Sequence, residues 1–278
     1  MGMEIAINGI WGNMGVGFAA LLTGFLIDVA GWRTAFWLPG IFSVFVGAAY
    51  LFSFGHRIGT RNAATASLAR PAPAVTAGVD QRGMLIKVVC IVFFTTAVSG
   101  IIFQGTTFSL PKVFDERLNG IATTATMVGW LAFLVFAVAS LAQVVVGRQL
   151  DRHGPRGVFA VVACIQVVFF SLMPGLTDWS ALLVALAFML GAFGQIPIND
   201  YMIGRMAKSD MRASIYGTRY VITFAVWAAV VPLIAWVHHN WGFDVLFYIL
   251  AASAAAILAA VCLLPSRLPE PAPDPVQP

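Results

Sequence analysis

A short charged stretch between two long apolar runs constrains the fold of this chain more than any other feature. The stretch Gly147–Arg156 lies between Thr124–Val146 and Val158–Met173, and neither run contains a charged side chain. An apolar run of roughly 20 residues matches the hydrocarbon core of a bilayer when it is helical, so the polar stretch must lie in water. The pattern predicts two membrane-spanning helices joined by a tight turn at the membrane surface.

The composition extends this prediction to the whole chain. Hydrophobic residues make up 60% of the 278 residues and charged residues 10%, whereas about a quarter of the residues of a soluble domain are charged. We therefore expect an all-α, polytopic membrane protein with about eight transmembrane helices. The expected spans are Ile5–Val29, Ala35–Phe54, Leu85–Leu110, Thr124–Val146, Val158–Leu176, Ser180–Ile203, Ala213–Val237 and Phe243–Leu264.

The distribution of basic residues predicts the orientation, because loops rich in Lys and Arg stay in the cytoplasm. Twelve basic residues fall in loops on one side of the membrane, namely Arg57, Arg61, Arg70, Arg82, Lys87, Arg148, Arg152, Arg156, Arg205, Lys208, Arg212 and Arg267. The other side has three, namely Arg33, Lys112 and Arg117. Both termini are then expected in the cytoplasm. We expect the chain to lie in a bacterial cytoplasmic (inner) membrane.

An internal repeat suggests how the spans are grouped. The segment 3–9 (MEIAING) and the span after it are similar in outline to the segment 211–217 (MRASIYG) and its span, so the first two spans correspond to the last two. Parallel repeats of this kind occur in transporters built from two related bundles. We expect residues 1–54 to be the last two helices of an N-terminal bundle, 55–84 a cytoplasmic linker, 85–265 a six-helix C-terminal bundle and 266–278 a disordered cytoplasmic tail.

Two motifs resemble those of the major facilitator superfamily of secondary transporters. The pattern Gly147-x-x-x-Asp151-Arg152-x-Gly154-x-Arg156 is similar to the cytoplasmic signature loop of that family. The glycine-rich stretch 12–17 (GNMGVG), with Gly24 and the exit at 31–33 (GWR), is similar to its helix 5. The resemblance implies that the chain comprises helices 5 to 12 of such a transporter, N-terminally truncated, with the linker in place of the central cytoplasmic loop.

The resemblance implies transport of a small organic solute, uptake or efflux, by alternating access in the lipid bilayer. Ala20 stands where proton-coupled efflux members have a proline, and Pro155 stands where the signature has a basic residue. If a proton is the coupling ion, we expect its carboxylate in the helices that the chain lacks. The alternatives are a non-transporting fragment that needs those helices from a partner chain and a membrane-embedded enzyme.

The signature loop supplies the candidate residues of a cytoplasmic gate. Its glycines allow close helix approach, its carboxylate can accept hydrogen bonds from a helix N-terminus, and Arg152 can pair with an acid, for which Asp200 is the expected partner. The gate candidates are Gly147, Asp151, Arg152, Gly154, Arg156 and Asp200. The alternative is a solvated basic loop without a gating role.

Four residues are candidates for solute binding. Arg219 lies about two turns inside a span, roughly 10 Å below its end, where a guanidinium is costly unless it faces a cavity or a partner. It would suit an anionic solute, and the alternative is a structural pair with Asp200. Trp11 is its counterpart in the repeat and Asn8 lies one turn earlier, whereas Gln104 lies beside two glycines; all three also suit plain helix packing.

The sequence favours no other class of function. The basic residues are dispersed, so we expect no nucleic-acid partner. The cysteines, Cys90, Cys164 and Cys262, lie within apolar runs and form no metal motif, and we expect neither a metal nor another cofactor. We find no HExxH pair and no nucleophile elbow, so we expect no enzyme.

Overall fold

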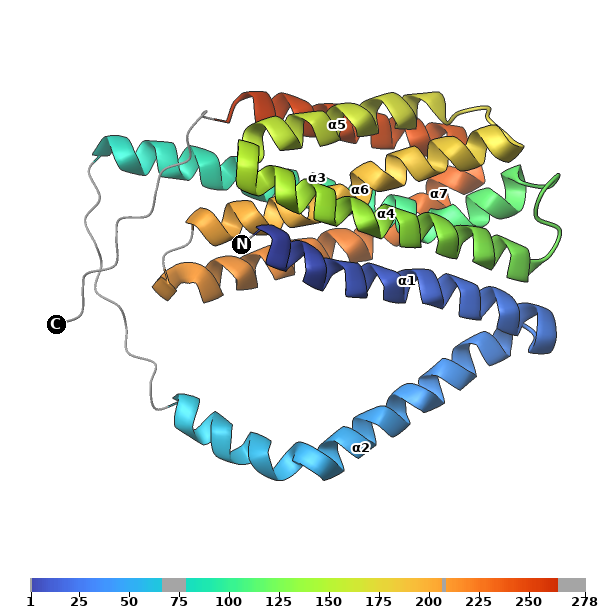
Figure 1. Cartoon of the computed structure of the whole chain (residues 1–278), viewed down its shortest axis with the longest axis horizontal. Helices are drawn as coiled ribbons and strands as arrows, with labels where there is room; N and C mark the ends of the chain where they lie inside the picture. The colour runs from blue at the N-terminus through green and yellow to red at the C-terminus, as the bar shows by residue number, and fades with distance from the viewer. Residues whose placement is uncertain (1, 67–78, 207–208, 265–278) are drawn as a thin grey trace.

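The chain forms a bundle of long α-helices in the computed structural model, which describes residues 2–66, 79–206 and 209–264 (Figure 1). Seven helices occupy the described residues, namely α1 (Gly2–Ala30), α2 (Trp32–Ala66), α3 (Val79–Arg117), α4 (Ala125–His153), α5 (Pro155–Leu172), α6 (Asp178–Met206) and α7 (Ser209–Cys262). Each contains a segment long and apolar enough to cross a membrane. The expected all-α, polytopic architecture is confirmed.

The last helix contains two of the expected spans. The membrane-crossing part of α7 is Gly217–Cys262, and its 46 residues would extend about 69 Å as a straight helix, twice the thickness of a hydrocarbon core. Gly242 interrupts it with a non-helical backbone at φ 75° and ψ −174°, a conformation that side chains with a Cβ rarely adopt. The chain reverses there, and the second part of α7 returns along the bundle (Figure 1).

Two connecting segments are more helical than we expected. The signature stretch forms the expected tight turn, but the turn is shorter than the expected spans left room for, because α4 continues to His153 and α5 begins at Pro155, leaving Gly154 alone between them. The linker expected over 55–84 is also shortened, since α2 extends to Ala66 and α3 begins at Val79. Alanine, which is frequent in residues 63–66, has the highest helix propensity. Residues 67–78 and the tail 266–278 lie outside the described residues.

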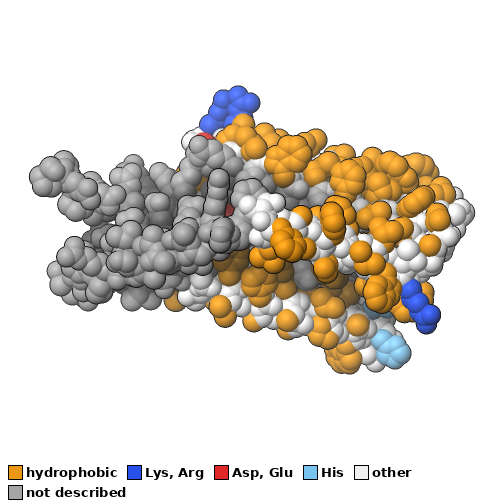
Figure 2. All heavy atoms as spheres, turned by 90° about the horizontal axis from the view of Figure 1, so that it is seen from below, with side chains coloured by type: hydrophobic (Ala, Val, Ile, Leu, Met, Phe, Trp, Pro, Cys, Tyr) orange, Lys and Arg blue, Asp and Glu red, His pale blue; other side chains and the backbone are white. Residues whose placement is uncertain are grey.

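The outer surface of the bundle suits contact with lipid. On the face in Figure 2 the described surface is mostly hydrophobic, with the Lys, Arg and His side chains at its edges. The second helix is the extreme case, because only 6% of its membrane-crossing window is buried inside the chain. It leaves α1 at Gly31 and diverges from the other helices (Figure 1). Its exposed side chains, such as Phe52 at 92%, satisfy the hydrophobic requirement of a bilayer rather than of a protein core.

The core lies between α3, α4, α5, α6 and the second part of α7. Phenylalanine rings connect the last four of these helices: Phe136 stacks on Phe193 at 5.7 Å between centroids, Phe170 contacts Phe188 at 4.9 Å, and Phe188 contacts Phe247 at 5.6 Å. All five side chains are fully buried. Aromatic pairs at such separations stabilise a core beyond the area that they bury.

The first helix packs along α4 more extensively than against any other helix. Glycines bring the two backbones close together at one end of this contact. A Cβ added to Gly129 would lie 2.8 Å from the carbonyl oxygen of Ala20, and one added to Gly24 would overlap the carbonyl oxygen of Ala125. Small residues permit such approach in membrane helices, where packing drives association.

We predict that Gly24→Ala lowers the thermal unfolding midpoint of the protein in detergent, because the added methyl group overlaps the backbone of α4. Overpacking of this kind costs about 1–3 kcal/mol. The matched control is Gly15→Ala on the same helix, since a Cβ there meets nothing within 4 Å. Equal midpoints for the two variants would contradict close packing of α1 on α4.

Candidate functional site

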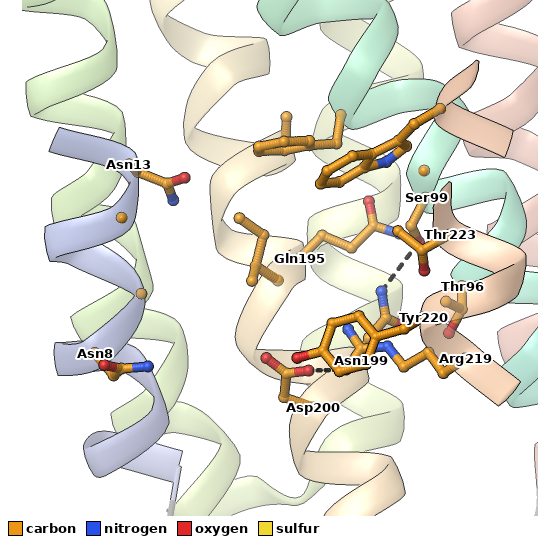
Figure 3. A pocket seen from close by; sticks show the side chains of 17 residues that line it. Asn8, Asn13, Thr96, Ser99, Gln195, Asn199, Asp200, Arg219, Tyr220 and Thr223 are labelled. Atoms are coloured by element: carbon orange, nitrogen blue, oxygen red, sulfur yellow. Dashed lines mark hydrogen bonds and ion pairs between the residues drawn. The ribbon is translucent and has the colours of Figure 1, made fainter. Parts of the chain in front are cut away.

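A polar cavity of about 360 Å³ lies between α1, α3, α6 and α7 (Figure 3). It is bounded by the early part of α1, the middle of α3, the late part of α6 and the early part of α7, so it lies toward the end of the bundle where α1 begins. Its lining residues are Asn8, Gly9, Gly12, Asn13, Thr96, Ser99, Gly100, Phe103, Ala192, Gln195, Ile196, Asn199, Asp200, Arg219, Tyr220, Thr223 and Trp227. Polar side chains in such numbers are unusual within membrane-spanning helices.

A hydrogen-bond network fixes the wall formed by α3 and α6. The amide of Gln195 donates to the hydroxyl of Ser99 at 2.5 Å, and the amide of Asn199 donates to the same oxygen at 3.1 Å. Ser99 in turn donates to the backbone carbonyl of Thr95 at 2.5 Å, and Gln166 of α5 donates to Gln195 at 2.8 Å. The hydroxyl of Ser99 is therefore saturated, and these contacts orient the neighbouring amides toward the cavity.

Arg219 and Asp200 form an ion pair in the cavity wall. The Nη1 of Arg219 donates to Oδ1 of Asp200, and the two side chains are 14% and 26% exposed. This pair connects α6 to the first part of α7. It satisfies one edge of the guanidinium, which has five N–H donors in all, and it offsets the cost of placing the charge within a membrane-spanning helix.

Several buried polar atoms of the cavity residues have no hydrogen-bond partner among the described residues. They are Asn13 Nδ2, Thr96 Oγ1, Asn199 Oδ1, Arg219 Nε and Trp227 Nε1. An unpaired buried polar atom costs about 1–3 kcal/mol. Three of these atoms are N–H donors only, and a fourth, the hydroxyl of Thr96, can donate. Donors therefore predominate among the unpaired atoms of the cavity wall.

The structure brings together two of the four expected solute-binding residues. Arg219 and Asn8 both line the cavity, from α7 and α1 respectively (Figure 3). Trp11 does not, and its side chain is 76% exposed. At 100° per residue it lies about 130° from the middle of the helix face that Asn8 and Asn13 present to the cavity, so the correspondence with Arg219 in the repeat was misleading. Gln104 is 6% exposed and does not line this cavity.

Sequence reasoning missed much of the cavity wall. Asn13, Thr96, Ser99 and Trp227 were not expected as site residues, although Asn13 and Thr96 are buried polar side chains of α1 and α3. The missed signal is spacing. Thr96 and Ser99 lie three residues apart and share a helix face, whereas Asn8 and Asn13, about 140° apart around α1, flank the face of Gly9 and Gly12.

The gate residues are placed differently from the expectation in one respect. Asp200 pairs with Arg219, and the expected pair with Arg152 is wrong: Arg152 is exposed at the end of α4, whereas Asp200 is half-buried on α6 facing α7. Asp151 Oδ2 accepts a hydrogen bond of 3.4 Å from the backbone N–H of Met3, in the first turn of α1. A carboxylate at a helix N-terminus is stabilised by the free N–H groups and the helix dipole.

The remaining residues of the signature stretch shape the α4–α5 connection. Gly154 has a positive φ of 76° that favours glycine, and its N–H closes the last turn of α4 on the carbonyl of Leu150 at 3.1 Å. Arg156 donates to the carbonyl oxygen of Cys262 at 3.0 Å, at the end of α7. Gly147 is buried within α4. Their role in gating stays a prediction.

A second carboxylate closes the opposite end of the α1–α4 contact. Asp28, in the last turn of α1, accepts hydrogen bonds from the backbone N–H of Ala125 at 3.3 Å and from that of Thr126 at 2.6 Å. It also accepts one from the hydroxyl of Thr126 at 2.5 Å. Asp28 thus binds the first turn of α4 in the same way that Asp151 binds the first turn of α1. Sequence reasoning overlooked Asp28 because an acid at the end of a span resembles an ordinary loop residue.

A polar cavity among apolar membrane-spanning helices is typical of membrane transport proteins. Residues 92–278, more than half of the chain, match the model of the Major Facilitator Superfamily. The chain belongs to this superfamily, and it is an integral, multi-pass membrane protein. No curated protein and no solved structure matches it. Among the residues described, no group of three His, Cys, Asp or Glu side chains is placed to hold a metal ion.

We predict that Asp200 and Arg219 are energetically coupled. The test is a double-mutant cycle of Asp200→Asn, Arg219→Gln and the double variant, measured by thermal unfolding. Each single variant leaves a half-buried group unpaired and lowers the stability. The double variant should recover part of this loss. The expected coupling energy is about 0.5–3 kcal/mol.

The matched control for this cycle is the pair of Lys112 and Asp115, which lie 2.6 Å apart with side chains 56% and 57% exposed. Exposed pairs of this kind contribute no more than about 1 kcal/mol. Additive effects of Asp200→Asn and Arg219→Gln would show that the contact is not a stabilising pair.

Proposed function

We propose that the chain transports a small carboxylate-bearing solute by alternating access across a bacterial cytoplasmic membrane, and that the cavity at Arg219 is its binding site. The observation that carries the proposal is the set of unpaired buried donors around a guanidinium in the cavity wall. A carboxylate that reached these donors would satisfy them with charge-assisted bonds. A neutral, purely apolar solute would leave them unpaired.

The geometry of Arg219 suits this role. Asp200 takes its Nη1, whereas its Nε is buried beside the cavity without a partner. A carboxylate that approaches the free edge of the guanidinium would form the paired bonds that the planar fork favours. A proton is kept as the proposed coupling ion.

The remaining wall indicates the shape of the solute. Phe103 stacks on Trp227 at 5.7 Å between centroids and 23° between planes, and both rings line the cavity beside Tyr220. An apolar or aromatic body could lie against these rings while its carboxylate faces Arg219. With a volume of about 360 Å³ the cavity suits a small metabolite rather than a peptide or a lipid.

The two ends of the α1–α4 contact are proposed as gates. With both termini in the cytoplasm, Asp151 would close the cytoplasmic end and Asp28 the outer end. Each contact joins residues 1–54 to the six-helix unit, so rocking of the two units would break one contact at a time. In this arrangement Gln104 and Trp11 are left as weaker candidates for solute contact.

We predict that the protein in proteoliposomes takes up at least one of acetate, succinate and benzoate in preference to the corresponding amide. Arg219→Gln should reduce this uptake about 10- to 100-fold, because a hydrogen bond to a charged group contributes about 1.5–3 kcal/mol. Arg219→Lys should retain part of it, since the charge remains but the forked donors are lost. Uptake is measured with radiolabelled solutes.

The matched control is Arg33→Gln, which removes an arginine that stacks on Trp32 at 5.4 Å on the exposed surface of α2. It should leave uptake unchanged. Equal uptake of acids and amides, or full activity of Arg219→Gln, would show that the solute is not recognised by this guanidinium.

A further inference from the structure

A second cavity lies at the opposite end of the bundle from the first. Its volume is about 600 Å³, and it is bounded by the late part of α1, the late part of α3 and the early part of α4. Its polar lining includes Thr23, Thr107, Lys112 and Asp115. The hydroxyl of Thr107, a residue only 9% exposed, has no hydrogen-bond partner among the described residues. A buried hydroxyl is costly without a partner, so this cavity too is built to hold water or a polar ligand.

The two cavities are separated by about one helical turn. On α1 the lining of the first cavity ends at Asn13 and that of the second begins at Val16. On α3 the corresponding residues are Phe103 and Thr107. At 1.5 Å per residue these steps are only about 5–6 Å along the helix axes. The buried side chain of Gln104 belongs to this intervening turn.

A chain of aromatic contacts connects the walls of the two cavities. Phe103 lines the first cavity and Phe136 lines the second. Phe193 of α6 contacts both rings, at 5.8 Å from Phe103 and 5.7 Å from Phe136 between centroids, and it is fully buried. The stack continues from Phe103 to Trp227. A polar solute or a hydrated ion cannot cross closely packed rings without losing its hydrogen bonds.

We propose that the second cavity is the far station of the solute path, and that Phe193 is the barrier residue between the two stations. The inference rests on the proposed transport function and adds to it a second place for the same carboxylate-bearing solute. Lys112 is the cation on the wall of the second cavity, and it is paired there with Asp115 at 2.6 Å and with Glu116 at 3.6 Å, so a solute carboxylate would have to exchange with one of these acids. Rotation of the Phe193 ring out of the stack, as α1 moves on α4, opens the path from one cavity to the other.

The test measures which side of the membrane each cavity faces. Cys90, Cys164 and Cys262 are exposed and are first replaced by serine. Thr96→Cys then reports on the first cavity and Thr107→Cys on the second, through their reaction with a charged, membrane-impermeant thiosulfonate added to one face of sealed vesicles. We expect Thr96→Cys to react more than about tenfold faster from the face where α1 begins, and Thr107→Cys from the other face, because the charged reagent must shed its hydration to pass the rings.

Removal of the barrier should abolish this sidedness. In Phe193→Ala both cysteine variants are expected to react from either face at rates within about threefold of each other, since no ring then separates the hydrated cavities. The matched control is Phe170→Ala, which removes another fully buried ring that lines neither cavity and should keep the tenfold preference. If Phe193→Ala does not fold, Phe193→Leu should reduce the preference in the same direction.

The outcome is independent of the solute, because the labelling reaction requires none. The inference is overturned if a folded Phe193→Ala protein keeps the tenfold preference for one face. It is also overturned if Thr96→Cys and Thr107→Cys react from the same face while Phe193 is present. Both results count against it even if carboxylate uptake is observed. Loss of sidedness without carboxylate uptake would support the barrier and contradict the proposed solute class instead.

Discussion

The antiparallel contact of α1 with α4 is closed at each end by a carboxylate that accepts hydrogen bonds from the first turn of the other helix. Asp28 holds the N-terminus of α4 and Asp151 that of α1. Both carboxylates are exposed, and these contacts combine hydrogen bonding with the helix dipole. Between them, Gly24 and Gly129 let the backbones touch. Both cavities depend on this contact, because α1 forms a wall of each.

The first cavity is lined largely by polar side chains, whereas the wall of the second is mainly apolar and contains Thr23, Thr107, Lys112 and Asp115. Polar atoms without partners line the first cavity on α1, α3, α6 and α7, while saturated amides such as Gln195 hold the wall behind them. The rings of Phe103, Phe193 and Phe136 pack as an ordinary core. A solute path that is open to one face at a time requires polar groups on both sides of an apolar barrier.

Much of the fold was predictable from the sequence, and less of the site. Apolar runs of membrane-spanning length fix the helices regardless of their neighbours, and the charge of Arg219 within such a run indicated a cavity or a partner; the structure shows both. The partner of Asp200 and the orientation of Trp11 depend on how helices rotate against each other, which periodicity leaves open when nearly every side chain is apolar. Helix ends also moved, because charged residues near Gly154 extend α4 and α5 into the interface instead of forming a loop.

The most direct measurement of the central claim, that a carboxylate binds at Arg219, is the nitrogen-15 spectrum of the indole N–H groups of the detergent-solubilised protein. Trp227 lines the cavity with an unpaired Nε1, and its peak among the eight tryptophans can be assigned with Trp227→Phe. We predict that benzoate shifts this peak saturably, that benzamide does not, and that the shift disappears in Arg219→Gln. A shift of the same size with benzamide, or one that persists in Arg219→Gln, would contradict recognition of the carboxylate by this guanidinium.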